Sequence, residues 1–216
     1  MISFYHMKIY MVRHGESEGN LNLSVQSNIE PLTETGKKQA QIVAKRLKNI
    51  DIDVVVSSTA VRAVQTAEEI VKELNVPHIK TELMVERRHP SRFLGIPRST
   101  ADFRRYELLR HENLNNPQWH FEDGENFFDV LERVKESKKF LESMSEKHVV
   151  VVSHGIFIRN FFGYIFMGDK YVPEFAANTL RMGTSNTGIT VFNVEKVDGI
   201  TRWSIRTWND HSHLPS

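Results

Sequence analysis

Two histidines of this chain stand in the same local setting. His14 occurs in VRHGES and His154 in VSHGIF, each just after an apolar run and each followed by glycine. Arg13 directly precedes the first histidine, and Arg62 lies one turn into a helix predicted after the apolar run 53–56. Imidazole can carry a proton or act as a nucleophile, and forked guanidinium groups match phosphate oxygens. If these four side chains meet, they form a pocket for a phosphoryl group.

Each of these residues also has a simpler interpretation. A lone histidine at the end of a strand is more often a satisfied structural residue than a catalyst, and Arg62 alone would be interpreted as a surface residue of its helix. The repetition of one local pattern around His14 and His154 favours the catalytic interpretation.

The elements around these residues predict a parallel sheet. Three apolar runs are typical of strands buried on both faces: 8–12, 53–56 and 148–153. Four segments have the pattern of helices: 33–48, 58–74, 125–144 and 156–166. Near the C-terminus, 188–194 and 200–208 flank an Asp-Gly turn and predict a hairpin. This alternation predicts an α/β fold, a three-layer α/β/α sandwich with a mostly parallel central sheet.

The predicted sheet would bring the two histidines together. Ligands of open parallel sheets bind at the carboxyl ends of the strands. His14 and His154 each follow a predicted strand, so both side chains are expected above one sheet edge.

Composition and charge exclude several classes of function. Lys and Arg number 28 against 27 Asp and Glu, a formal charge of +1, which argues against a basic face for nucleic acid. The chain has no cysteine, which excludes thiolate nucleophiles, disulfides and thiolate metal sites. No signal-like segment begins the sequence and no apolar run approaches the ~20 residues of a membrane span. We therefore expect a cytoplasmic protein with no nucleic-acid and no membrane partner.

One region does not follow the alternation of strands and helices. We expect a single domain over residues 1–216 with a lid or insertion over the active site at about 81–123, a stretch rich in Arg, His, Asn and Pro. A solvated excursion without a task is the alternative. Four arginines of this region are candidate anion contacts: Arg87, Arg88, Arg104 and Arg105.

An ordered set of motifs resembles a known family. It comprises RHGESEGN, PLTETGKKQA, SSTAVRAVQTA, the region of Glu86, DGEN and VVSHG. Together these motifs resemble the histidine phosphatase superfamily, in its phosphoglycerate mutase-like branch, in the order of the family and over nearly the whole chain. The tail NDHSHL is similar to the ending of many bacterial members.

The resemblance implies a role for five residues. His14 would be the nucleophile that forms a phosphohistidine, with Arg13, Arg62 and His154 around the phosphoryl group. Glu86 would protonate the leaving oxygen, although its arginine neighbours allow the alternative of a simple ion pair. An imidazole attacks only through an unprotonated nitrogen, so an acceptor such as a backbone carbonyl should hold the other N–H of His14. No metal and no cofactor are expected.

Three further positions match the family with less specificity. Asn20 and Gln26 match residues that line the phosphate pocket, and Ser58 matches the residue before the Arg62 helix. Ser27 stands where the family more often has glycine, so Gln26 could lie differently. The loop SNTG, residues 185–188, is either a family loop with backbone donors for the phosphate or an ordinary turn.

Three activities remain open from the sequence. The first is a phosphomonoester hydrolase acting on a small phosphorylated metabolite. The second is a cofactor-dependent phosphoglycerate mutase, which the run after Glu86 disfavours because ERRHPS lacks the Tyr-Gly element of the mutases. The third is a non-catalytic relative that binds a phosphate ligand, which the presence of all five central residues disfavours. A homodimer is left as an option.

Overall fold

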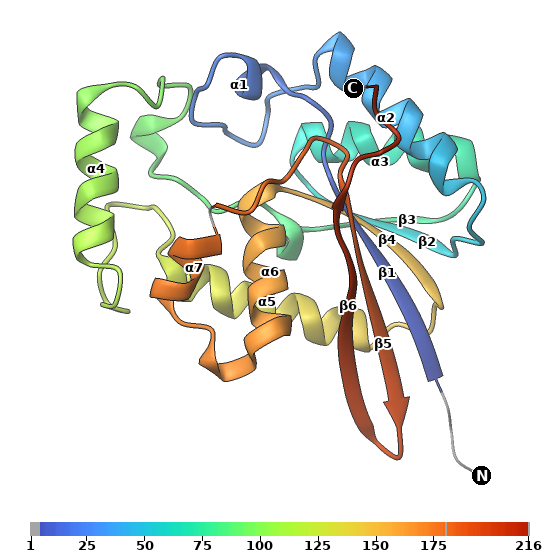
Figure 1. Cartoon of the computed structure of the whole chain (residues 1–216). Coiled ribbons are helices and arrows are strands. Elements are labelled where there is room, and N and C mark those ends of the chain that lie inside the picture. The colour runs from blue at the N-terminus through green and yellow to red at the C-terminus, as the bar shows by residue number, and fades with distance from the viewer. Residues whose placement is uncertain (1–4, 180, 216) are drawn as a thin grey trace.

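The computed structural model describes residues 5–179 and 181–215, within which six strands form one mixed sheet (Figure 1). Its strands are β1 Tyr5–Arg13, β2 Val54–Ser58, β3 His78–Thr81, β4 His148–Ser153, β5 Ile189–Val197 and β6 Ile200–Asp210. They lie in the order β3-β2-β4-β1-β5-β6, with the first four parallel and the last two antiparallel to their neighbours. The predicted parallel core and C-terminal hairpin are confirmed.

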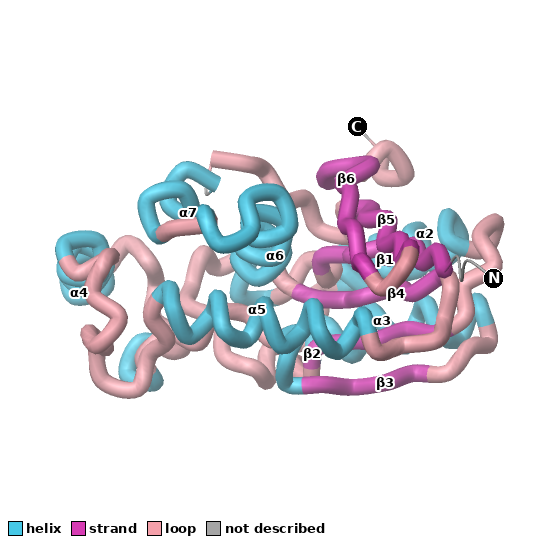
Figure 2. Tube along the Cα trace, turned by 90° about the horizontal axis from the view of Figure 1, so that it is seen from below, coloured by secondary structure: helices cyan, strands magenta, loops and turns pink. Residues whose placement is uncertain are grey.

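Helices cover both faces of the sheet (Figures 1 and 2). They are α1 Glu18–Leu21, α2 Glu34–Leu47, α3 Val61–Leu74, α4 Ala101–Glu112, α5 Phe127–Glu142, α6 Gly155–Met167 and α7 Pro173–Thr179. The apolar sides of α2 and α3 pack on one face of the sheet, whereas α5 and α6 pack on the other. The fold is therefore the predicted three-layer α/β/α sandwich. No helix within the described residues is long and apolar enough to cross a membrane.

The continuous apolar runs of the central strands serve two separate cores. Met11 of β1 and Val151 of β4 pack under α5 and α6, while their neighbours Val12 and Val152 pack under α2 and α3. Successive side chains of a strand point to opposite faces, so a strand covered on both sides needs apolar residues at every position. This requirement explains why these strands read as unbroken runs.

The segment predicted as a lid has a small core of its own. It contains the 3₁₀ turns Glu82–Met84 and Ser91–Phe93 as well as α4. Phe93 and two residues of α4, Phe103 and Tyr106, pack with Val25 from the loop after α1. Helix α4 was not predicted, because only two of its twelve residues are buried and its sequence has no apolar stripe. Three further short elements, α1, β3 and α7, were also not predicted.

Candidate active site

The two histidines lie side by side at one edge of the sheet. Strands β1 and β4 are paired in parallel so that Arg13 lies opposite Ser153, and each histidine is the next residue. The ring centroids of His14 and His154 are 5.0 Å apart. The predicted meeting of the two imidazoles above one edge is confirmed.

The hydrogen bonds of His14 define its tautomer. Its Nδ1 lies 2.7 Å from the carbonyl oxygen of Gly15, and a carbonyl only accepts, so Nδ1 carries the proton. Nε2 is then an unprotonated acceptor, to which Nε of Arg62 donates at 3.3 Å. Burial, together with the cations of Arg62 and Arg13, lowers the pKa of His14 well below the usual range of histidine. The imidazole is thus neutral, with its lone pair on Nε2, and the carbonyl predicted to hold its N–H is that of Gly15.

The glycine after His14 allows a close crossing of two backbones. A Cβ atom on Gly15 would lie 2.5 Å from the carbonyl oxygen of Gly36 at the start of α2. The N–H of Gly15 donates to Oγ1 of Thr66 on α3, at 3.1 Å. Gly15 of RHGESEGN therefore packs against Gly36 of PLTETGKKQA, and only residues without a side chain fit there.

Arg62 reaches the site from the first turn of α3. Its side chain is buried, and Nη1 donates to the carbonyl oxygen of Ser27 at 2.6 Å. The carboxylate of Glu30 lies 3.9 Å away. Burial lowers the pKa of Arg62, whereas the charges of Glu86 and Glu30 raise it. Arg62 is therefore a core cation of the site and not a surface residue.

His154 has one ring nitrogen with a partner and one without. Its Nε2 lies 2.8 Å from Oγ of Ser58, which already accepts the N–H of Ala60. A serine hydroxyl has one donor and two acceptor sites, so this bond is compatible with either tautomer of the His154 ring. Nδ1 is buried without a hydrogen-bond partner among the described residues. Burial and the Arg62 cation lower the pKa of His154 well below its usual range, so this ring is also neutral.

Arg13 and Arg159 line the site on its α6 side. Nη1 of Arg13 donates to the carbonyl oxygen of Thr184, and Nη1 of Arg159 donates to Oγ1 of the same residue at 3.2 Å. Burial lowers the pKa of Arg13 to about 10, which leaves the guanidinium charged at neutral pH. The Nε atoms of both arginines are buried without a partner in the part of the chain that the structure describes.

Glu86 is held at the N-terminus of α6. Its carboxylate accepts the backbone N–H groups of Ile156 and Phe157, both at 3.0 Å, and that of Arg87 at 3.0 Å. Arg133 of α5 donates to the backbone carbonyl of Glu86 at 3.3 Å and thereby supports the segment. The first turn of a helix favours negative charge, so these contacts fix the carboxylate against the cavity.

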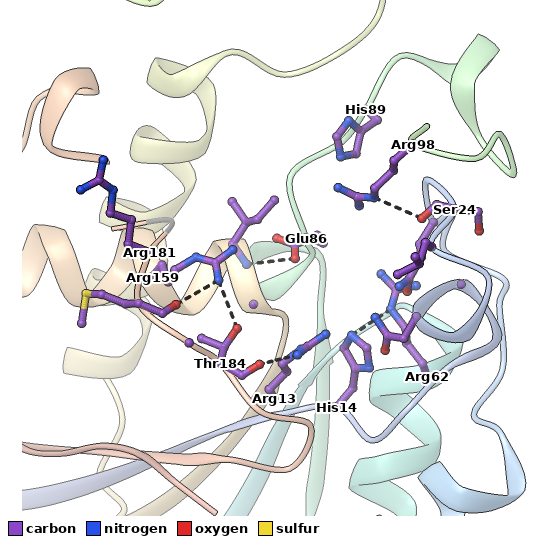
Figure 3. Close-up of a pocket in the computed structure, with 18 residues that line it drawn as sticks. Arg13, His14, Ser24, Arg62, Glu86, His89, Arg98, Arg159, Arg181 and Thr184 are labelled. Carbon is purple, nitrogen blue, oxygen red and sulfur yellow. Dashed lines mark hydrogen bonds between the residues drawn. The ribbon is translucent and has the colours of Figure 1, made fainter. Parts of the chain in front are cut away.

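Arg13, His14, Arg62, Glu86 and Arg159 line a cavity of about 380 Å³ (Figure 3), whereas His154 is fully buried and does not line it. Figure 3 shows Arg159 and Arg181 on one side of the cavity and Arg98 and His89 on the opposite side. The charged lining residues are five arginines and one glutamate: Arg13, Arg62, Arg98, Arg159, Arg181 and Glu86. A chain with a net charge of only +1 thus gathers a formal excess of four positive charges around one cavity.

Of the less specific predictions, Asn20 and Gln26 do line the cavity. Oγ of Ser17 lies 3.0 Å from Oδ1 of Asn20 and 3.1 Å from Oε1 of Gln26, so one hydroxyl connects them. Ser58 does not line the cavity and contacts His154, and the carbonyl oxygen of Ser27 accepts a hydrogen bond from Arg62.

The four predicted arginines of the insertion lie outside the cavity. Arg87 and Arg88 line a neighbouring hollow of about 210 Å³ and are paired with glutamates, Arg87 with Glu107 at 3.4 Å. Arg104 and Arg105 are exposed on α4, and Arg105 lines a separate surface hollow. The structure therefore does not bring Arg104 and Arg105 to the site, because Phe103 and Tyr106 occupy the inward face of the helix.

The residues that line the cavity without having been predicted include His89, Arg98, Arg159, Arg181 and Thr184. Arg159 had a visible signal, since it is the one charged residue in the apolar segment 156–166. His89 is neutral because burial and Arg87 lower its pKa to about 2. Within the described residues, no group of three or more His, Asp or Glu could hold a metal ion.

Comparison with known proteins agrees with this geometry. The sequence model of the histidine phosphatase superfamily (branch 1) matches residues 9–211, and the chain belongs to that superfamily. It is 28% identical over 215 residues to phosphoglycerate mutase-like protein 4 of Arabidopsis thaliana, covering 97% of this chain and 87% of the relative. It is 35% identical over 164 residues to phosphoserine phosphatase 1 of Hydrogenobacter thermophilus, covering 71% and 73%.

The fold comparison gives the same architecture. A crystal structure of phosphoserine phosphatase from Entamoeba histolytica, in complex with 3-phosphoglyceric acid, superimposes with a TM-score of 0.72. The match covers 97% of this chain and 100% of that chain at 22% identity. At that identity, the likeness supports the fold and leaves the activity to be argued from the site.

Proposed function

We propose that this protein hydrolyses phosphomonoesters through a phosphohistidine on His14. The observation that carries the proposal is the neutral imidazole with its unprotonated Nε2 beside the Arg62 guanidinium. A neutral nitrogen nucleophile among cations suits attack on an anionic phosphoryl group, because phosphoryl transfer depends mainly on positioning and charge stabilisation. Two relatives named as phosphatases, at 35% and 37% identity, support the same reaction class.

The first half-reaction transfers the phosphoryl group to the enzyme. Nε2 of His14 attacks phosphorus, an Nε2–P bond forms, and the P–O bond to the leaving group breaks. Glu86 delivers a proton to the leaving oxygen, which departs as a neutral alcohol. Glu86 lies on the cavity wall beside the N-terminus of α6, so its proton can reach an oxygen held over His14.

The second half-reaction restores the enzyme. A water molecule takes the place of the alcohol, gives a proton to the carboxylate of Glu86 and attacks phosphorus. The N–P bond breaks, its electron pair returns to Nε2 of His14, and inorganic phosphate leaves. Each cycle ends with a neutral His14 and returns to Glu86 the proton that it gave to the alcohol.

The neighbouring cations would stabilise the transferred group in both steps. Arg13 and Arg62 carry donors that can contact the equatorial oxygens, while His154, which does not line the cavity, packs against the His14 ring at a centroid distance of 5.0 Å. The buried Nε of Arg13, which has no hydrogen-bond partner among the described residues, supports this role, since a buried donor without an acceptor is costly unless a ligand supplies one.

The remaining arginines favour a substrate with a second negative group. Arg98, Arg159 and Arg181 also line the cavity, and none has a carboxylate within 4.0 Å in the described part of the chain. A single phosphate dianion does not need five guanidinium groups. We therefore propose a small phosphorylated metabolite that carries a further anion, such as a carboxylate or a second phosphate.

Phosphoglycerate mutase activity is the second candidate, because the same arginines could retain a sugar acid during transfer. The name of the Arabidopsis relative also points to the mutases. The two activities are separated by a phosphate-release assay over sugar phosphates, phosphoglycerates, phosphoamino acids and nucleotides, run beside an assay of 3- to 2-phosphoglycerate interconversion. We expect phosphate release to dominate. Efficient interconversion with little release would establish the mutase.

Location and assembly follow from the sequence expectations. We propose a cytoplasmic protein, which cell fractionation tests. Homodimer formation stays a prediction, which light scattering on the purified protein tests.

A further inference from the structure

One short loop touches the phosphoryl pocket from behind. We call residues 184–188, which directly precede β5, the back loop. Thr184 contacts Arg13 and Arg159 through its carbonyl and hydroxyl oxygens. The side-chain amide of Asn186 donates to the backbone carbonyl of His14 at 2.9 Å. Three residues that line the cavity are therefore held by five consecutive positions.

The back loop also extends the sheet beyond the end of β1. The N–H of Arg13 donates to the carbonyl of Gly188 at 3.2 Å, and the N–H of Thr187 donates to the carbonyl of Arg13 at 2.9 Å. Asn186 additionally lies 3.3 Å from Oδ1 of Asn20, another residue of the cavity wall. The backbone that carries Arg13 and His14 thus has the back loop as its direct support.

The conformation of the back loop is not one that its sequence prefers. Thr187 is fully buried and has a φ of 55°, in the left-handed region that β-branched residues avoid. Such a conformation persists only when the surrounding contacts impose it. Thr187 is held by its N–H bond to Arg13 and by a contact from the end of the chain.

Two residues of the C-terminus grip the back loop. Oδ1 of Asn209 accepts the N–H of Ser185 at 2.7 Å, and a Cβ atom on Gly188 would lie 2.1 Å from that oxygen. Nε2 of His213 lies 3.1 Å from Oγ1 of Thr187. Ser185 and Gly188 thus contact Asn209 at the end of β6, and Thr187 contacts His213 in the tail after that strand.

Arg46 of α2 anchors this grip to the body of the protein. It forms an ion pair with Asp210 and donates to Nδ1 of His213 at 3.0 Å. Since arginine only donates, Nδ1 of His213 accepts and its proton is on Nε2, which donates to Thr187. Burial and the Arg46 cation lower the pKa of His213 to about 4, so the ring stays neutral at physiological pH.

We propose that Asn209, Asp210 and His213, the C-terminal brace, position the phosphoryl pocket by fixing the back loop. The proposal rests on the proposed function. The brace residues touch neither substrate nor reacting atoms. They act through Thr187 and Ser185 on the backbone of Arg13 and His14, and through Thr184 on two guanidinium groups. Loss of the brace should therefore make the positions of His14 and of the two guanidinium groups less precise. Small displacements of such groups lower the rate of the reaction strongly.

The test uses two histidines of the same tail. His213→Ala removes the donor to Thr187. His211→Ala is the matched control, because His211 is exposed and, within the described residues, its ring has one hydrogen-bond partner, the backbone carbonyl of Asn209. For each variant we measure kcat/KM on a phosphomonoester that the wild type hydrolyses and the inhibition constant of orthovanadate, which mimics the transferring group. We expect kcat/KM to fall about tenfold and vanadate inhibition to weaken about tenfold in His213→Ala. His211→Ala should match the wild type.

Two further variants separate positioning from folding. His213→Gln offers an amide donor to Thr187 and should restore most of both constants. Thr187→Gly removes the hydroxyl but suits a φ of 55°, so it should lose vanadate affinity without losing thermal stability on account of its backbone.

The outcomes discriminate between the two proposals. An active wild type whose His213→Ala variant melts lower but keeps both constants would overturn the brace alone, because the tail would then be purely structural. A wild type inactive towards every phosphate ester would overturn the proposed function and the brace with it.

Discussion

Replacement of Glu86 by glutamine separates proton delivery from shape. In Glu86→Gln the side chain keeps its size and one acceptor oxygen, but its amide cannot give up a proton. In the wild type, Oε2 of Glu86 accepts the N–H of Ile156 and Oε1 accepts the N–H of Phe157, each at 3.0 Å. An amide group at that place leaves one of these N–H groups without an acceptor. The expected loss is about 1–3 kcal/mol of stability, which a protein with about 5–15 kcal/mol survives.

The kinetic effect should depend on the leaving group. An alkyl phosphate such as glycerol 3-phosphate releases a strongly basic alkoxide that needs a proton, so kcat/KM should fall about 10²–10⁴-fold in Glu86→Gln. A nitrophenyl phosphate releases a stable phenolate, so its kcat/KM should fall less than about tenfold by the same reasoning. Phosphate release from both substrates is compared in the wild type, in Glu86→Gln and in the control Glu82→Gln. Glu82 is a nearby glutamate with an exposed side chain.

The two substrates make the result decisive. Equal losses on the alkyl and the aryl ester would show that Glu86 positions the site and does not act as the acid. A large loss in Glu82→Gln would show that negative charge in this segment, and not the proton of Glu86, controls the rate.

Two further predictions follow from the charges of the site. The pKa values of His14, His89 and His154 are lowered by burial, so the unfolded chain binds protons that the folded protein does not. The free energy of unfolding should therefore decrease as the pH falls through about 6.5. Together, the three rings should account for a decrease of about 4 kcal/mol between about pH 7 and about pH 5.5. Urea unfolding that is unchanged over this range would contradict their buried neutral state. The second prediction compares 3-phosphoglycerate, which carries a carboxylate, with glycerol 3-phosphate, which does not. The kcat/KM of the wild type should be higher for 3-phosphoglycerate. The ratio of the two kcat/KM values should drop about tenfold in Arg181→Ala and stay unchanged in Arg105→Ala. Equal ratios in all three proteins would exclude Arg181 from substrate selection.

The central site could be predicted because its residues sit at points of regular structure. His14 and His154 follow strands whose unbroken apolar runs identify them as central, and parallel strands end at one edge. The position of Arg62 follows from its place in the first turn of the next helix. At these positions the local sequence pattern and the overall fold predict the same location for the side chain.

The outer wall of the cavity could not be predicted in the same way. Arg98 and Arg181 lie outside the helices and strands, and no periodicity determines where such a residue points. The Arg104 and Arg105 pair was chosen for its charge, although Phe103 and Tyr106, three positions apart, define the inward face of that helix and leave the pair outside. Arg159 lies in the apolar segment 156–166, which the sequence pattern predicts to be core. A single charged residue in such a helix is the feature that needs an explanation.

The most direct test of the account is to trap the phosphorylated enzyme. The wild type is mixed with a ³²P-labelled phosphomonoester, quenched in base and digested, and the labelled peptide is sequenced. We predict a label that is stable in base and labile in acid, carried by the peptide that contains His14, and absent from His14→Ala. A label that persists in His14→Ala, or that maps to another residue, would contradict the assignment of His14 as the nucleophile.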